Sequence, residues 1–108
     1  MTPVLPSAAP QFLLTISIGY DLHELVEDAL LEHPEWAPGF TVSEALGHGS
    51  EARLVTASEK VRGHARQMLF KIIAPEAACR AILQLVGETV PGSGAFYWLH
   101  PVTEAGEI

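Results

Sequence analysis

Four stretches of the chain show the period of two that is typical of β-strands. They run from Gln11 to Gly19, from Phe40 to about Leu46, from about Arg66 to Ile73, and from Ala95 to Val102. In the first stretch every second residue from Phe12 to Ile18 is apolar, while the residues between them are mixed. We therefore expect a sheet with one face covered by helices.

The first helix is predicted between Asp21 and Pro34. An apolar stripe at helical spacing comprises Leu22, Leu25, Val26, Ala29 and Leu30. Asp21, followed three residues later by Glu24, resembles a capping box, so we expect the helix to begin there. Pro34 is expected to end it shortly after His33.

The second helix is predicted to follow the third strand. Pro75 suits the first helical position, because that position needs no backbone N–H. The expected core stripe comprises Ala78, Ile82, Leu85 and Val86, with Cys79 beside it. Gly87 and the segment ETVPGSG indicate the end of the helix and a loop.

The order strand, helix, strand, strand, helix, strand predicts the fold class. It indicates an α+β, ferredoxin-like βαββαβ domain, with a four-stranded antiparallel sheet and two helices on one face. We expect this single domain to span residues 11–108, after a flexible tail over residues 1–10. The second face of the sheet is too apolar to remain exposed to solvent, which favours an oligomer.

Composition narrows the function. The chain has 108 residues and a formal net charge of −7, which disfavours binding to nucleic acid. No apolar run is long enough to insert into a membrane. The single Cys79 fits a cytoplasmic protein and is expected to be a small core residue rather than a nucleophile. No nucleophile with a base and an orienting group is visible, so we expect no enzyme.

An irregular connection over residues 47–65 joins the second and third strands. In or beside it lie four of the chain's six basic residues, namely Arg53, Lys60, Arg62 and Arg66. These cations could bind phosphate or carboxylate, or could be ordinary solvated loop charges. The glycines of Gly47-His48-Gly49 could let a ligand approach the backbone, or could end the strand at a bend.

Three histidines raise a second possibility. His48 and His64 flank the connection, and His100 lies on the fourth strand. Imidazoles with a carboxylate such as Glu59 would suit Zn, Cu or Ni, although the spacing matches no established metal motif. The alternative is three histidines in polar or half-exposed positions.

Three segments resemble one known family. GFTVSEALGHG resembles the part of P-II signal proteins in which a G-[MF]-T-V-[TS]-E strand leads into a G-x-G turn. FKIIAPEAACRAILQLV and GSGAFYWLHPVTEA resemble that family's third strand with second helix, and its closing segment. The match runs from Phe12 to Ala105. The chain looks closer still to small proteobacterial P-II-like proteins of unknown function, whose genes often neighbour heavy-metal efflux pumps.

The resemblance implies a homotrimer with small effectors, typically adenine nucleotides, in clefts between subunits. A mobile T-loop, here the 47–65 connection, would report the bound state to a partner protein. The positions that match the family's cleft are Thr41, Gly47, His48, Gly49 and Ser50 on one side, Gly63, His64 and Ala65 on the other, and Gly92 and Gly94 in the phosphate-closing loop. The basic cluster adds Arg62 and Arg66.

The sequence departs from the family at three places. Ser50, Glu51 and Ala52 replace basic and amide residues, the segment ETVPGSG lacks the family's lysine, and the tail TEAGEI lacks its arginines. We therefore expect no triphosphate binding in the usual mode. The connection also holds no tyrosine, which excludes nucleotidylation of a tyrosine there.

These observations favour a non-enzymatic, trimeric sensor that binds a small effector, such as an adenine nucleotide, and signals to a transporter or enzyme through the 47–65 connection. The alternative is a transition-metal-binding protein linked to metal efflux, with His48, His64 and His100 as ligands. A second alternative is a structural subunit without any ligand.

Overall fold

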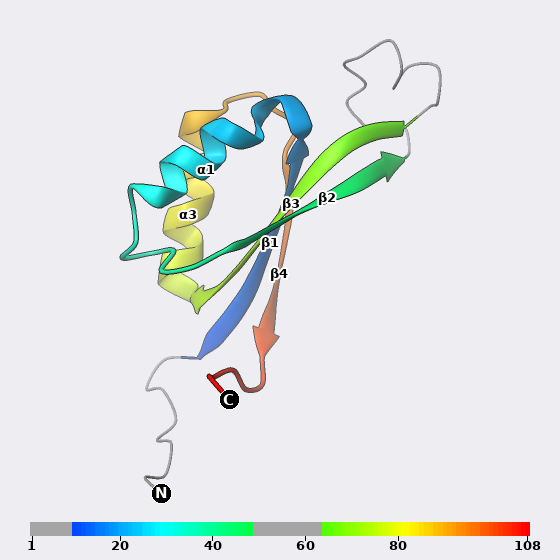
Figure 1. Ribbon diagram of the computed structural model, residues 1–108. Coiled ribbons are helices and arrows are strands. Elements are labelled where there is room, and N and C mark those ends of the chain that lie inside the picture. The colour runs from blue at the N-terminus through cyan, green and yellow to red at the C-terminus, as the bar shows by residue number, and fades with distance from the viewer. Residues whose placement is uncertain (1–9, 49–63) are drawn as a thin grey trace, which may run out of the picture.

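The structure, a computed structural model, describes residues 10–48 and 64–108 (Figure 1). Its elements are β1 (Gln11–Gly19), the 3-10 helix η1 (Tyr20–Leu22), α1 (His23–Leu31), β2 (Thr41–His48), β3 (His64–Pro75), α3 (Glu76–Thr89) and β4 (Phe96–Val102). The strands form one antiparallel sheet in the order β2-β3-β1-β4. Both α-helices cover the same face, which confirms the predicted ferredoxin-like α+β fold.

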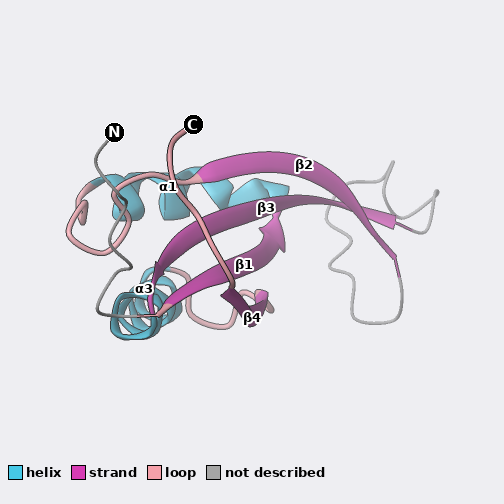
Figure 2. Ribbon diagram, turned by 90° about the horizontal axis from the view of Figure 1, so that it is seen from below, coloured by secondary structure: helices cyan, strands magenta, loops and turns pink. Residues whose placement is uncertain are grey.

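The two central strands, β1 and β3, pair along the whole of β1. The register runs from Gln11 opposite Pro75 to Gly19 opposite Gln67. Past the Gly19 end of β1, β2 and β3 continue as a two-stranded ribbon, which comprises Leu46–His48 and His64–Arg66. Figure 2 shows β2 and β3 extending past the two helices. Both strands are thus two residues longer at this end than the sequence pattern predicted.

The core lies between the helices and one face of the sheet. Its largest fully buried side chains include Leu14, Ile16 and Ile18 of β1, Phe70 and Ile72 of β3, Val26 and Leu30 of α1, and Ile82 of α3. Alternate positions of each strand supply this layer, because successive side chains of a strand point to opposite faces. Within the described residues, no helix is long and apolar enough to cross a membrane.

The second face of the sheet, here called the open face, carries no helix from residues 10–48 or 64–108. From β4 it presents Phe96 and Trp98, whose side chains are 69% and 42% exposed, and from β3 it presents Ile73, which is 44% exposed. Lys71 lies among them, opposite the buried Thr15 of β1. In a single subunit this face therefore exposes aromatic side chains to solvent. This agrees with the sequence pattern, which placed apolar residues on both faces of the fourth strand.

The predicted start of the first helix was wrong. Asp21 lies inside η1, and the residue that precedes α1 is Leu22, with no side-chain cap. The His23 Nδ1 atom is hydrogen-bonded to the Tyr20 carbonyl oxygen, so the tight turn is held locally and a capping box does not form. The predicted stripe is also narrower, because Leu25 is 52% exposed.

The predicted place of Pro75 was wrong by one position. Pro75 is the last residue of β3, paired with Gln11, and it immediately precedes α3 with an extended ψ of 157°. A proline lacks the N–H that a ladder bond would need, and therefore fits the end of a strand as readily as the start of a helix. The helix itself begins with Glu76 in its first turn, where a negative charge is favourable.

Cys79 is fully buried on α3, in agreement with its prediction as a core residue. Its Sγ atom lies 3.6 Å from the Ala74 carbonyl oxygen, and burial raises the pKa of the Cys79 thiol. Little reactive thiolate should exist at neutral pH.

We therefore expect a colourimetric thiol reagent to leave Cys79 unmodified in the folded protein at pH 8, and to modify one thiol per chain in guanidinium chloride. An exposed cysteine on the same helix, introduced as Gln84→Cys, should react at once and serves as the control. Rapid reaction of Cys79 without denaturant would contradict its burial.

Candidate functional site

The loop between α3 and β4 contains a Gly-Ser-Gly segment, Gly92–Gly94, with unusual backbone geometry. Gly92 and Gly94 have φ angles of 68° and 73°, in the left-handed region that side chains disfavour. Ser93 fixes the loop, because its N–H donates to the Val90 carbonyl oxygen at 3.2 Å and its Oγ accepts from the Ala95 N–H at 3.1 Å. The two glycines are thus required by the shape of this loop.

The backbone N–H groups of Gly92 and Gly94 donate to no acceptor in residues 10–48 or 64–108. Backbone N–H groups beside left-handed residues can attract an anion, although the Ser93 N–H between these two glycines is already bonded to Val90. The predicted phosphate-closing role of these two glycines is therefore compatible with the backbone. No lysine or arginine of this loop adds charge to it.

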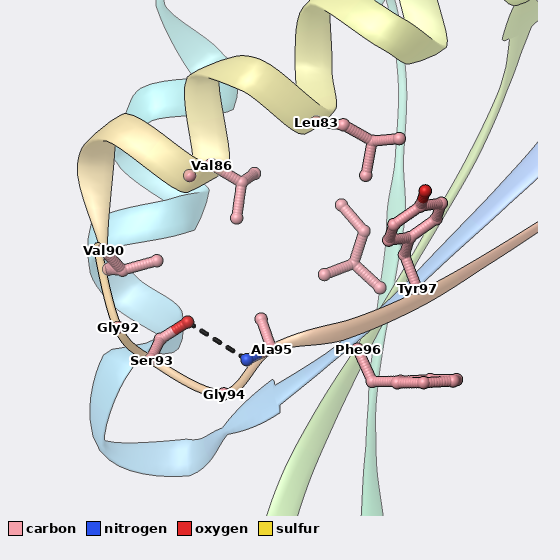
Figure 3. A pocket seen from close by; sticks show the side chains of 11 residues that line it. Leu83, Val86, Val90, Gly92, Ser93, Gly94, Ala95, Phe96 and Tyr97 are labelled. Atoms are coloured by element: carbon pink, nitrogen blue, oxygen red, sulfur yellow. Dashed lines mark hydrogen bonds between the residues drawn. The ribbon is translucent and has the colours of Figure 1, made fainter.

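A cavity of about 270 Å³ lies against the Gly-Ser-Gly loop (Figure 3). Its walls come from the end of α3, the loop, and the start of β4, with Ile16 of β1 also lining it. Figure 3 shows Leu83, Val86 and Tyr97 around the space, while Phe96 points away on the other side of β4. The lining residues are Ile16, Leu83, Val86, Gly87, Val90, Gly92, Ser93, Gly94, Ala95, Phe96 and Tyr97.

This loop cavity suits an uncharged or weakly charged ring with a small anionic group. Most of its lining side chains are apolar, Tyr97 offers an aromatic ring, and no described lining residue is charged. A flat ring could pack on the apolar wall while an anionic group meets the free N–H groups of the loop. The sequence revealed the two glycines but not the cavity, which depends on how α3 and β4 diverge.

The second group of predicted site residues lies on the β2–β3 ribbon. Gly47 is opposite Ala65, and His48 is opposite His64, so the register brings these four residues together. A Cβ atom added to Gly47 would lie 2.7 Å from Cγ of Gln67. Glycine is therefore needed here to make room for the Gln67 side chain rather than for an unusual φ.

Gln67 is a residue that the sequence analysis overlooked. Its Oε1 atom accepts a hydrogen bond from Ser17 Oγ at 3.3 Å, and its side chain lies across Gly47. It thereby connects β1 to the base of the ribbon. Only the register could have revealed this contact, since Ser17 and Gln67 are fifty positions apart.

Arg66 is engaged with neighbouring side chains at the point where the ribbon leaves the sheet. Its Nε atom donates to Glu44 Oε1 at 2.8 Å, and its guanidinium lies 3.6 Å from the centroid of the Tyr20 ring. The Arg66 guanidinium lowers the pKa of Glu44, and the Glu44 carboxylate raises the pKa of Arg66. The cation–π and ion-pair contacts together attach the ribbon to the end of β1.

The remaining predicted residues lie elsewhere. Thr41 begins β2, six positions from Gly47, which is about 20 Å along a strand. His100 pairs with Leu13, whose partner on β3 is Ile73, nine positions from His64. One subunit therefore does not bring the three histidines together. Gly49, Ser50, Arg62 and Gly63, with the side chain of His64, lie outside the described residues.

The described part of the chain contains no group of three or more His, Cys, Asp or Glu side chains placed to hold a metal ion. A metal site with His48, His64 and His100 remains a prediction from the sequence, and it would require residues from more than one subunit or from the undescribed segment.

Comparison with known proteins identifies the family and the fold. A family described as "Protein of unknown function (DUF3240)" matches residues 8–108. A crystal structure of a DUF3240 family protein from Shewanella baltica is similar, with a TM-score of 0.75 and 22% identity over 93% of this chain and 98% of that chain. A search of curated proteins finds no match.

Two PII-like proteins share the fold. One is a nitrogen regulatory PII-like protein from Thiomonas intermedia bound to ADP, AMP and bicarbonate, with a TM-score of 0.67 and 17% identity over 92% of this chain and 97% of that chain. The other, described as PII-like and signaling, is from Thermus thermophilus, with a TM-score of 0.60 and 22% identity over 87% and 88% of the two chains. These similarities establish the fold.

The loop geometry can be tested with two glycine substitutions of opposite expected sign. Gly94→Ala should lower the free energy of unfolding by about 1 kcal/mol, because alanine is strained at a positive φ. Gly87→Ala lies within α3, with nothing within 4 Å of the added Cβ, and should raise it by about 0.5 kcal/mol. Urea denaturation of both variants measures the two effects. A stabilising Gly94→Ala would contradict the left-handed conformation.

The Arg66 contact can be tested by titration of Glu44. Because the partner holds Glu44 charged, the stability that this pair contributes is present above the ordinary glutamate pKa and is lost as pH falls through the lowered pKa. Arg66→Gln should return the pKa of Glu44 to the ordinary range, measured by NMR on the carboxyl carbon. Arg80→Gln, which removes a cation that pairs with Glu76, should leave it unchanged. An ordinary Glu44 pKa in the unaltered protein would refute the contact.

Proposed function

Because the chain belongs to the DUF3240 family and has the fold of PII-like proteins, we propose that it is a non-enzymatic, PII-like regulatory protein whose effector is an adenine nucleotide. It would act as a homotrimer, with the effector in clefts between subunits. The 47–65 connection would report effector binding to a partner, either a membrane transporter or an enzyme.

The observation that carries this proposal is the loop cavity beside two left-handed glycines. It combines an apolar wall for a base with backbone N–H groups for a phosphate. On the same fold, the Thiomonas intermedia protein binds ADP and AMP. The absence of charged side chains among the described lining residues favours a nucleotide of low charge, so AMP and ADP should bind more tightly than ATP.

The open face supports the proposed trimer. Phe96 and Trp98 expose aromatic surface that would be buried if three sheets met. Phe96 borders the loop cavity while its side chain lies on the open face, so assembly would bring a neighbouring subunit close to one edge of the cavity. The ribbon base of one subunit, with Gly47 and His48, would then supply residues to the loop cavity of its neighbour.

The ribbon supports the proposed signalling route. Glu44, Arg66 and Tyr20 hold its base, and the 47–65 connection continues from its end. A nucleotide that contacts the connection would change its preferred conformation, provided that it binds one conformation more tightly. A difference of about 1–3 kcal/mol in binding free energy between the two conformations is enough for a usable switch.

Calorimetric titration tests the effector. With EDTA present, AMP and ADP should bind saturably and ATP more weakly. Tyr97→Ala should raise the dissociation constant for AMP by about tenfold, because stacking of a base on an aromatic side chain is worth about 1–3 kcal/mol. Leu25→Ala, which removes a similarly exposed apolar side chain on α1, should leave it unchanged.

The same titration separates the alternatives. Failure of all three nucleotides to bind would contradict the effector proposal and favour a structural subunit without a ligand. Heat from Zn²⁺, Cu²⁺ or Ni²⁺ in EDTA-free buffer, lost in His48→Ala, would instead favour the metal-binding alternative. The observation behind that alternative is the direct pairing of His48 with His64 across the ribbon.

Sedimentation velocity tests the proposed assembly. Phe96→Asp should reduce the mass from three chains to one, because a carboxylate would have to be buried without a partner at the interface. Leu31→Asp is the matched control, since Leu31 is 68% exposed on the helical side, and it should keep the trimer mass. An unaltered mass in Phe96→Asp would exclude the open face as the interface.

A further inference from the structure

A second cavity, here called the helix cavity, lies on the helical layer away from the open face. It has a volume of about 300 Å³ and lies between α3 and the turn that follows α1. His33 and Trp36 of the turn form one wall, and Ala81, Gln84, Leu85 and Glu88 of α3 form the other. It shares no residue with the loop cavity, and the proposed effector does not use it.

The aromatic wall is held in place by the backbone of the turn. The His33 N–H donates to the Leu30 carbonyl oxygen at 3.0 Å, and the Trp36 and Ala37 N–H groups donate to the His33 carbonyl oxygen at 3.1 and 3.0 Å. The rings of His33 and Trp36 stack with centroids 4.4 Å apart and an angle of 6° between their planes. Ala37, 5% exposed, anchors the turn in the core. The wall therefore needs little ordering when a ligand binds.

One carboxylate, Glu88, lines this cavity, and a second, Glu35, contacts the lining residue His33. Glu88 Oε1 accepts a hydrogen bond from Gln84 Nε2 at 3.1 Å, one helical turn away. Glu35 Oε1 lies 2.7 Å from His33 Nδ1, and this hydrogen bond lowers the pKa of Glu35. Both carboxyl groups are exposed and therefore accessible to a ligand.

The helical layer around the cavity is acidic. The two α-helices and the turn after α1 carry seven acidic residues, namely Glu24, Glu27, Asp28, Glu32, Glu35, Glu76 and Glu88. Against these acids the same elements contain one arginine, Arg80, and its Nη2 atom lies 3.4 Å from Glu76 Oε2. The field at this surface therefore attracts cations and disfavours anions.

We propose that the helix cavity binds a lysine or arginine side chain from a basic segment of a partner protein. The aliphatic stem would pack on Ala81 and Leu85, as long basic side chains commonly do. The cationic head would meet the Trp36 ring and the Glu88 carboxylate, two groups that both favour a positive charge. The acidic helical layer would attract the flanking basic residues of the segment. This docking site shares no lining residue with the proposed nucleotide site.

The experiment uses the whole chain carrying Trp98→Phe, so that Trp36 is the remaining tryptophan, and acetyl-Arg-Arg-Arg-amide as the probe. Trp36 fluorescence should change saturably, and the affinity should fall as salt rises. Glu88→Gln should raise the dissociation constant about fivefold, the effect of losing about 1 kcal/mol from one exposed ion pair. Glu24→Gln removes the same charge near the start of α1 and should change it less than twofold.

A second measurement does not depend on tryptophan emission. Anisotropy of the same peptide carrying fluorescein should show weaker binding to Trp36→Leu than to the unaltered protein, with both proteins folded by circular dichroism. Equal effects of Glu24→Gln and Glu88→Gln would overturn the proposal, because they would indicate diffuse attraction by the whole helical layer. An absence of saturable binding would overturn the proposal. A change in the mass of the assembly in Glu88→Gln would also overturn it, because that result would indicate that a second copy of the chain occupies the cavity.

Discussion

The antiparallel pairing of β1 with β3 places both layers of the subunit, the loop cavity and the helix cavity. Its register, from Gln11 opposite Pro75 to Gly19 opposite Gln67, decides which side chains face the helices and which face the open side. A slip of one residue would move Ile16 out of the core. Because β3 extends beyond β1, the same register also determines where the β2–β3 ribbon leaves the sheet, and so where Arg66 meets Tyr20.

The fold could be predicted from the sequence because its signals are local. Four alternating strand patterns and two apolar helical stripes follow one another in the βαββαβ order. The glycines at positions 92 and 94 indicate a left-handed backbone, which glycine adopts more freely than other residues. The start of α1 was not predictable in the same way, because η1 and a bond from His23 to the Tyr20 carbonyl replace the expected cap. Cross-strand contacts such as Arg66 with Glu44 depend on register, which no local pattern reveals.

The two cavities suit ligands of opposite character. The loop cavity has no charged side chain among its described lining residues and offers backbone N–H groups, which suits a small anion attached to a ring. The helix cavity has an aromatic wall and the Glu88 carboxylate, which suits a cation. Since they lie on different parts of the subunit, an effector and a partner could bind at the same time. The ribbon, held at its base by Arg66, lies at a third place.

We proposed that assembly through the open face completes a nucleotide site. Native mass spectrometry in the presence of AMP tests both parts of it together. We expect a complex of three chains carrying up to three nucleotides, and no AMP on single chains of the Phe96→Asp variant. AMP bound with full occupancy to single chains, or a trimer that takes up no nucleotide, would contradict it.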